Sequence, residues 1–225
     1  MKLTQCILIA SLSVICCSYS KRAREEKAVQ NDQFSTFIKN FDSLRLPLSI
    51  IRKDLYKYGG RKFFDSVRTD PRNPYYQKVE AKYYRFLQRE IDRTNRHEYK
   101  YLLASGLGKL SIILYKQIDL DAESFSIKMS TLTANGVVID TLTLAGMKAN
   151  VSEKYVEIDK DWKIHTTFYQ YLPDEPPLQA LVANKEDEEF VITSDGHFKK
   201  TFTAKNKGYF DIGPGNKSLV PYKKN

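Results

Sequence analysis

The stretch from Thr131 to Gly146, TLTANGVVIDTLTLAG, constrains the fold more than any other part of the sequence. Apolar and polar residues alternate on both sides of Asn135-Gly136, with the period of two that is typical of a half-buried antiparallel strand. Asn tolerates a positive φ and Gly adopts one without steric cost, so Asn-Gly is a strong hairpin signal. The stretch therefore predicts two strands joined by a two-residue turn at Asn135 and Gly136.

The same pattern recurs through the second half of the chain. The turn sequences Asp159-Lys-Asp161 and Ser194-Asp-Gly196 also lie between alternating arms. Strands are predicted at Tyr99–Ala104, Lys109–Ile118, Glu123–Thr133, Val137–Ala145, Ser152–Ile158, Trp162–Leu172, Asn184–Thr193 and His197–Ala204, with a last short strand at Gly208–Ile212. Regularly spaced hairpins favour an antiparallel meander, either a curved open sheet or a partly closed barrel.

A short amphipathic helix is predicted ahead of this sheet. Its apolar residues repeat at i, i+3, i+4 and i+7, which places them on one helix face. They are Phe34, Phe37, Ile38 and Phe41. The segment that follows, from Leu44 to Ile51, is predicted to be extended because Pro47 disfavours a helical conformation at the residue before it.

A second, longer helix is predicted from Pro74 to about Thr94. Asn73 supplies a cap, Pro74 suits the first helical position, and an apolar stripe follows at Tyr75, Val79, Tyr83, Phe86, Leu87 and Ile91. The predicted fold class is therefore α+β, with one short and one long N-terminal helix packed on an antiparallel meander of about eight to nine strands.

The domain organisation follows from these segments. Residues 1–20 are predicted to be a signal peptide and 21–33 a charged flexible tether. Residues 34–212 form a single α+β domain, helical over 34–96 and an antiparallel sheet over 97–212, and 213–225 form a loose tail.

The first 20 residues are typical of a signal peptide. Lys2 gives a short positive region, a run of apolar and small residues follows, and Ser18-Tyr19-Ser20 offers small residues at positions −3 and −1 of a cleavage site. The apolar run is shorter than the roughly 20 residues of a membrane-spanning helix. The mature protein is therefore expected to be exported to the periplasm, the outer membrane or the cell surface.

All three cysteines, Cys6, Cys16 and Cys17, lie in this segment, so the mature domain is predicted to have no disulfide, thiol nucleophile or cysteine metal site. Cys16 and Cys17 end the apolar run just before a polar tether, as in a bacterial lipoprotein. The residues ahead of them differ from the small ones usual in that motif. Two expectations stay open: lipid attachment at Cys16 or Cys17, with membrane contact only through that lipid, and simple cleavage after Ser18 or Ser20.

Positive charge is concentrated in the first half of the chain. The formal net charge is +9, and the segment from Arg52 to Lys109 holds 15 Lys and Arg against 7 Asp and Glu. Five cations on the predicted long helix form the candidate polyanion-contacting set: Lys78, Lys82, Arg85, Arg89 and Arg93. Export argues against nucleic acid and leaves envelope glycan, anionic lipid or another envelope protein as partners. In the alternative interpretation, the stripe packs on the sheet and the cations are merely solvated.

The sequence offers little for catalysis. His97, His165 and His197 lack metal-ligand spacing, and no nucleotide-binding or nucleophile-elbow motif occurs, so no metal, cofactor or catalytic residue is predicted. The pairs Asp119-Leu-Asp121 and Asp159-Lys-Asp161 are typical of hairpin turns. The carboxylates Asp140, Glu153, Glu157 and Asp174 are the candidates for a glycosidase-type pair.

Several phrases resemble small exported proteins of Bacteroidetes, many of them lipoproteins without an assigned function. These phrases are FSTFIKNF followed shortly by LRLPLSI, then TANGVVIDTLTLAG, VEIDKDWKI and FVITSDGHFKK, and they span about Phe34 to Lys200. The resemblance implies a cell-envelope location and carries over no catalytic or binding residues.

Together these observations predict a non-catalytic, exported cell-envelope protein that acts as a binding or structural module. The alternative is a small periplasmic or surface hydrolase that acts on glycan through its carboxylates. A clustered, buried Asp/Glu pair in a cleft would favour the hydrolase, and an apolar concavity without perturbed acids would favour the binding module.

Overall fold

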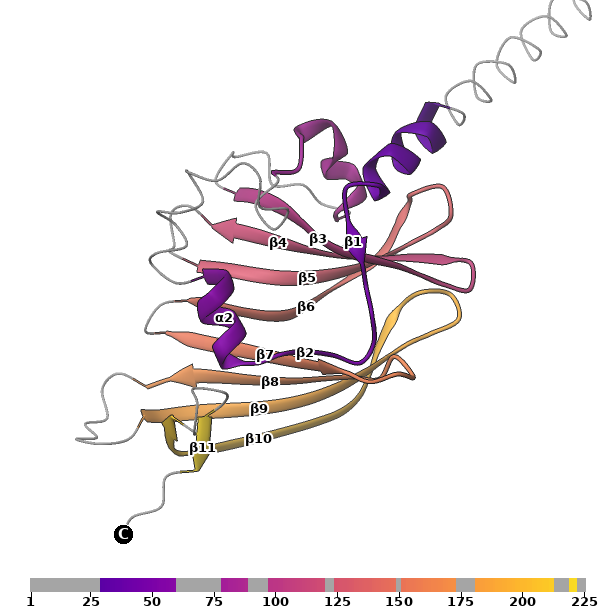
Figure 1. Ribbon diagram of the computed structural model, residues 1–225. Helices are drawn as coiled ribbons and strands as arrows, with labels where there is room; N and C mark the ends of the chain where they lie inside the picture. Colours follow the sequence, from indigo (N-terminus) through magenta and orange to yellow (C-terminus); the bar gives the residue numbers. More distant parts are fainter. Residues whose placement is uncertain are drawn as a thin grey trace, which may run out of the picture.

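The computed structural model describes residues 29–59, 78–88, 97–119, 124–148, 151–172, 181–212 and 219–221. These residues build one 11-stranded sheet that is strongly curved, with short helical segments packed on it (Figure 1). Eight strands follow one another in chain order, each antiparallel to the next. They are β3 (His97–Leu107), β4 (Leu110–Asp119), β5 (Ser124–Leu132), β6 (Val138–Lys148), β7 (Ser152–Ile158), β8 (Ile164–Tyr171), β9 (Leu181–Ile192) and β10 (Phe198–Ile212).

Three very short strands complete the sheet. β1 (Asp42–Ser43) runs parallel to the start of the meander at β3, and β11 (Leu219–Pro221) pairs with the end of β10. β2 (Leu48–Ile50) pairs with β7. The described helical segments are 29–38, α2 (Arg52–Gly59) and the 3-10 helix η2 (Ala81–Phe86).

The Asn135-Gly136 hairpin lies where the sequence predicts it, but the predicted two-residue turn is wrong. The Thr133 N–H donates to the Val137 carbonyl at 2.9 Å, and the Gly136 N–H donates to the Thr133 carbonyl at 3.0 Å. In this loop only Gly136 has a positive φ, of 80°. The connection is therefore a three-residue loop with one left-handed position, the second most common class of hairpin connection.

Two other hairpins use the same loop. In the β7–β8 connection the left-handed position is Trp162, with φ 63°, and in the β9–β10 connection it is Gly196, with φ 91°. Each loop begins with a residue whose side-chain oxygen accepts the N–H four positions later, at 3.1 Å for Thr133, 2.9 Å for Asp159 and 2.9 Å for Thr193. The predicted turns at 134–136, 159–161 and 194–196 are thus confirmed as one structural type.

Both faces of strand β4 are covered. Its residues from Ile112 to Lys116 are all buried, and because alternate strand residues face opposite sides, they feed two separate cores. Ile112 and Leu114 belong to the larger core, which includes Leu55 of α2. Ile113 belongs to a second core on the other face, built with the aromatic residues of helix 29–38 and η2.

The second core is dense in aromatic rings. Phe37 lies at its centre, with ring centroids 5.2 Å from Phe86, 5.5 Å from Tyr83 and 5.7 Å from Tyr101. Such tilted ring pairs add to the free energy gained by burying apolar area. These contacts fix helix 29–38 and η2 on strands β3 to β5.

The predicted fold class is wrong in its helical part. A long helix from Pro74 to Thr94 does not form over the described residues 78–88, where Lys78 makes an isolated bridge to Lys100 and only η2 is helical. The Val79 N–H donates to the carbonyl of Tyr99 at 2.8 Å, so this segment satisfies its backbone against the edge of the sheet. The stripe residues Val79, Tyr83, Phe86 and Leu87 are nevertheless buried. The described part of the chain is mostly β and has few short helices.

The predicted strand count is also wrong, because the sheet has 11 strands. Two segments predicted as separate strands, at His197–Ala204 and Gly208–Ile212, are one continuous strand, β10. The additional strands β1, β2 and β11 are two or three residues long. Strands of two or three residues are too short to show an alternating pattern in the sequence. They form because a longer strand elsewhere in the chain pairs with them.

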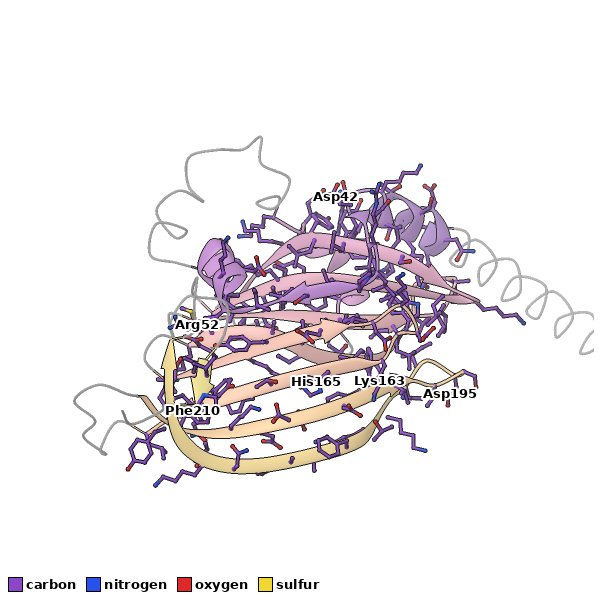
Figure 2. All side chains as sticks on the ribbon, turned by 60° about the horizontal axis from the view of Figure 1, so that its bottom comes forward. Asp42, Arg52, Lys163, His165, Asp195 and Phe210 are labelled. Atoms are coloured by element: carbon purple, nitrogen blue, oxygen red, sulfur yellow. The ribbon has the colours of Figure 1, made fainter. Side chains whose placement is uncertain are left out.

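A buried ion pair ties the N-terminal segment to the middle of the sheet. β6 and β7 pair only from Gly146 to Lys148, and β2 pairs with the part of β7 beyond that contact. Directly after β2, Arg52 forms a two-point contact with Glu153 of β7, with Nε–Oε2 at 2.9 Å and Nη2–Oε1 at 3.1 Å (Arg52 is labelled in Figure 2). The Tyr155 hydroxyl donates to the same carboxylate at 2.5 Å. The side chains of Arg52 and Glu153 are only 7% and 3% exposed.

Breaking this ion pair is expected to destabilise the folded protein. In Arg52→Met the Glu153 carboxylate loses its charged partner while it stays buried, so the free energy of unfolding should fall by about 3–5 kcal/mol. The double variant Arg52→Met, Glu153→Gln removes both charges and should recover much of that loss. Urea unfolding followed by circular dichroism measures both values. A double variant no more stable than Arg52→Met would contradict the pairing.

Lys116 of β4 is buried among apolar side chains. It is 1% exposed, lies opposite Lys100 and Ile127 in the sheet, and its Nζ is 4.4 Å from the centre of the Phe125 ring. Burial, together with the smaller effect of the neighbouring Lys100 charge, lowers the pKa of the Lys116 ammonium to about 6. The folded protein therefore favours the neutral amine at a pH where the unfolded chain binds a proton.

The pH dependence of stability should report this amine. Because the folded pKa lies near 6 and the unfolded value near 10.5, the unfolded state holds the extra proton in that window, so stability rises with pH across it. We expect the wild type to gain up to about 1.4 kcal/mol per pH unit over Lys116→Met between pH 7 and 9. Urea unfolding of the two proteins across this range checks the prediction. Parallel curves would contradict it.

Candidate functional site

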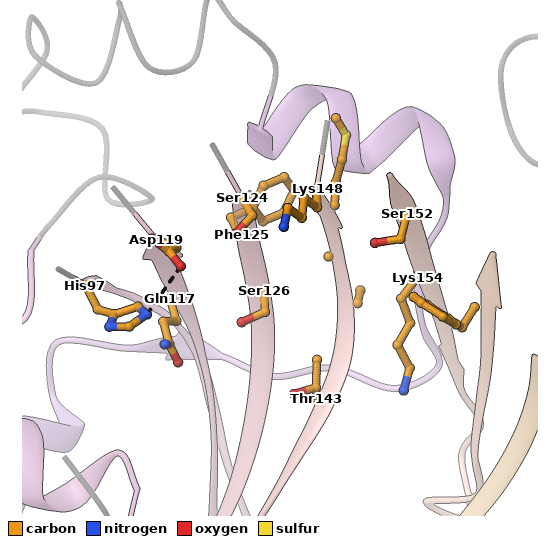
Figure 3. A pocket seen from close by; sticks show the side chains of 14 residues that line it. His97, Gln117, Asp119, Ser124, Phe125, Ser126, Thr143, Lys148, Ser152 and Lys154 are labelled. Carbon is orange, nitrogen blue, oxygen red and sulfur yellow. Dashed lines mark ion pairs between the residues drawn. The ribbon is translucent and has the colours of Figure 1, made fainter. Parts of the chain in front are cut away.

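An open polar hollow lies on the face of the sheet opposite α2, and in Figure 3 that helix is seen behind the strands. Its volume is about 260 Å³. It is lined by His97, Gln117, Asp119, Ser124, Phe125, Ser126, Thr143, Ala145, Gly146, Met147, Lys148, Ser152, Lys154 and Phe168. We call this set the polar hollow. Its size lies just below the range usual for small-molecule sites.

Strand register explains why these side chains meet. His97 of β3 lies opposite Asp119 of β4, which lies opposite Ser124 of β5. Ser124 lies opposite Lys148 of β6, and Lys148 lies opposite Ser152 of β7. Directly paired residues point to the same face of a sheet, so five polar side chains form one row across five strands.

A second row runs beside the first and forms the floor. Gln117, Ser126, Gly146, Lys154 and Phe168 are paired in succession across β4 to β8. Gly146 contributes no side chain to the centre of this row. A Cβ atom there would lie only 2.5 Å from the carbonyl oxygen of Phe125, so the close approach of β5 and β6 requires glycine. The hollow exists because the row has a gap at this position.

The rim carries two ammonium groups. Lys148 is exposed, while Lys154 is half-buried and lies 3.5 Å from Glu188 of β9. Burial lowers the pKa of the Lys154 ammonium, and the Glu188 carboxylate opposes that shift. Burial raises the pKa of Glu188, but Lys200 and Lys154 outweigh it and leave that pKa below its ordinary value. The Glu188 carboxylate is thus shared by two lysines, and Lys148 is the exposed cation at the hollow.

The Gln117 side chain of the hollow carries a buried polar atom that lacks a hydrogen bond among the described residues. The side-chain oxygen Oε1 of Gln117 has no donor among the described groups of the protein. A buried acceptor left in this way costs about 1–3 kcal/mol. The hydroxyl groups of Ser124, Ser126 and Thr143 line the same space. The arrangement provides an acceptor, several hydroxyls and a cation around one small volume.

The hollow does not have the geometry of a serine hydrolase. A histidine must lie between the serine and the carboxylate to take the hydroxyl proton. Here the carboxylate is in the middle, since Asp119 separates His97 from Ser124, and His97 Nε2 lies 3.8 Å from Asp119 Oδ2. Two strand spacings of about 4.8 Å place His97 and Ser124 roughly 10 Å apart in the sheet.

The three described glycosidase candidates, Asp140, Glu153 and Glu157, do not form a pair. Glu153 is buried against Arg52, and Glu157 lies four residues along the same strand, about 13 Å away at roughly 3.3 Å per residue. Glycosidase carboxyl groups lie about 5–10 Å apart. Asp140 accepts the Phe198 N–H at 2.9 Å in another part of the sheet. Asp174 lies outside the described residues.

The structure disperses the predicted polyanion-contacting set. Lys78 pairs with Glu98 at 3.0 Å, Lys82 pairs with Glu80 at 2.7 Å, and the Arg85 guanidinium donates to Gln33. Arg89, Arg93 and the candidate lipid-attachment residues Cys16 and Cys17 lie outside the described residues. The described cations therefore have neighbouring acceptors on the protein and do not converge on the polar hollow.

The three histidines lie apart, each near a carboxylate. His165 Nε2 lies 3.8 Å from Asp187, and His197 Nδ1 lies 3.6 Å from Asp140. Across the ranges that the structure describes, no group of three or more His, Cys, Asp or Glu side chains is placed to hold a metal ion. In the same ranges no helix combines the length and the apolar character needed to cross a membrane.

Sequence reasoning did not identify the polar hollow. Its two most informative members, Gln117 and Lys154, stand in predicted strands as ordinary polar residues of alternating arms. The one available signal was a glycine inside a predicted strand, since such a glycine often marks a close backbone approach or a bulge. Gly146 is such a glycine, and the ladder shifts register between Ile127 and Lys128 nearby.

The chain was compared with models of protein families, with curated proteins and with solved structures, and none of the three comparisons finds a match.

Proposed function

We propose that this protein is a non-catalytic binding module of the cell envelope and that the polar hollow holds one anionic sugar residue. The observation that carries the proposal is the buried, unsatisfied Oε1 of Gln117 inside a hollow lined with hydroxyls. A turn of the Gln117 amide would bring this oxygen toward the hollow, where a ligand hydroxyl that donates to it would remove the cost of the empty acceptor. Selectivity for a hydroxylated ligand follows from that cost.

The rim supports the anionic part of the ligand. Lys148 is exposed at the edge of the hollow, and a carboxylate or phosphate on the ligand would form a charge-assisted hydrogen bond with its ammonium. Lys154 is already engaged by Glu188, so we assign the anion to Lys148. Ser124 and Ser152 lie opposite Lys148 on either side and provide further donors.

The rival function, a small glycan hydrolase, has less support. Such an enzyme needs two carboxylates on either side of the bond it cleaves. The polar hollow holds one carboxylate, Asp119, beside His97. A binding module needs no second carboxylate. An envelope glycan that bears acidic sugars is the ligand source that fits an exported protein.

Binding of simple sugars tests this proposal. Isothermal titration calorimetry with glucuronate, glucose 6-phosphate and glucose should show tighter binding of the two anions than of neutral glucose. Lys148→Gln should weaken anion binding by about tenfold, since one charge-assisted hydrogen bond is lost. The matched control Lys160→Gln, at an exposed lysine of the β7–β8 turn, should bind like the wild type.

Gln117→Met separates binding from folding. It removes the unsatisfied oxygen, so we expect it to weaken sugar binding while raising the free energy of unfolding. Equal binding of all three sugars, or no effect of Lys148→Gln and Gln117→Met, would contradict the proposal. Release of nitrophenol from a nitrophenyl glucuronide, lost in Glu157→Gln, would favour the hydrolase.

The proposed location has its own test. Mass spectrometry of the protein from its native host should find a processed N-terminus. An acylated Cys16 or Cys17 would establish a lipid anchor, and a free Tyr19 or Lys21 would establish simple cleavage. An intact chain that starts at Met1 would contradict export.

A further inference from the structure

The two edges of the sheet are treated differently. At the first edge, the backbone of β3 is met by β1 and by the bridge between Lys78 and Lys100. At the other edge, β10 pairs with β9 along its length, and β11 covers only its last residues, Phe210 to Ile212. In the described part of the chain, the Phe198 N–H at the start of β10 is bonded to Asp140 of β6, and the outer side of β10 from Lys199 to Tyr209 has no strand beside it (Figures 1 and 2).

This edge is long, exposed and basic. From Lys199 to Tyr209 every residue except Ala204 and Gly208 is exposed. The segment contains four lysines and no acidic residue: Lys199, Lys200, Lys205 and Lys207. Edge lysines discourage pairing with neutral or basic strands, so the same charges select for an acidic strand.

The two faces of the edge differ in chemistry. Lys205 lies opposite Glu186 of β9 and pairs with it at 3.1 Å, and Lys207 follows on the same face two residues later. Phe202, which is 47% exposed, and Ala204 lie on the opposite face. A strand added here would therefore meet Lys205, Lys207 and the ring of Tyr209 on one face, and Phe202, Ala204 and Asn206 on the other.

We infer that β10 is a docking edge for an extended peptide segment in which acidic and apolar residues alternate. The backbone of that segment would continue the sheet, its acidic side chains would lie beside Lys205 and Lys207, and its apolar side chains would lie beside Phe202 and Ala204. A second copy of this chain is a poor occupant, because β10 paired with β10 brings lysines against lysines. This inference does not depend on the polar hollow.

A synthetic ten-residue peptide of alternating Glu and Val, labelled with fluorescein, tests the inference by fluorescence anisotropy with the mature protein. We expect it to bind, and a matched Lys-Val peptide not to bind. In the double variant Lys205→Glu, Lys207→Glu, affinity for the acidic peptide should fall by about tenfold or more, since two favourable cross-strand pairs become repulsive. The control Lys160→Glu, in the β7–β8 turn, should bind as the wild type does.

Backbone methylation shows whether the peptide adds as a strand. Alternate N–H groups of a strand point to the same side, so methylating one alternate set should abolish binding and methylating the other should leave it intact. Equal effects of the two sets, equal binding of the acidic and basic peptides, or no binding at all would overturn the inference. A dimer in sedimentation that the peptide does not dissociate would place a second copy at this edge and would also overturn it.

Discussion

The two-point ion pair between Arg52 and Glu153 fixes the arrangement on which the rest of the structure depends. Two charges removed from water must meet each other with good geometry, so only one placement of the N-terminal segment satisfies both. That placement sets β2 against β7 and lays α2 on the larger core, where Leu55 is fully buried. With this face of the sheet filled, the opposite face is left to provide a site.

The site lies where the aromatic cover of that opposite face stops. Helix 29–38 and η2 cover β3 to β5 with rings, and the boundary is marked by Gln88, whose amide donates to the Tyr99 hydroxyl at 3.1 Å. Beyond it Gln117, Ser126 and Lys154 line the polar hollow. The same strands thus serve as core on one half of a face and as a ligand surface on the other.

Much of the sheet was predictable, because alternation is a local property. The hairpin at Asn135, the turns near Asp159 and Ser194 and the strands around them follow from period-two patterns and turn residues. The structure of residues 78–88 was not predictable from local pattern. The Val79 N–H bonds to the Tyr99 carbonyl of the edge strand, and this tertiary contact overrides the helical period of the apolar residues. The four described residues of the predicted stripe are buried, but they were assigned to the wrong secondary structure, and Tyr75 and Ile91 lie outside the described residues.

By itself, the sequence determined the antiparallel sheet and the position of its main turns. Only the tertiary structure decided which polar residues are buried, paired or open to a ligand. Glu153 looks like any outward residue of an alternating strand, yet it is buried by an arginine 101 positions earlier. Gln117 and Lys148 become one site only when register brings their strands together. Local alternation shows which side chains share a face of the sheet. The pairing of neighbouring strands determines which groups those side chains contact.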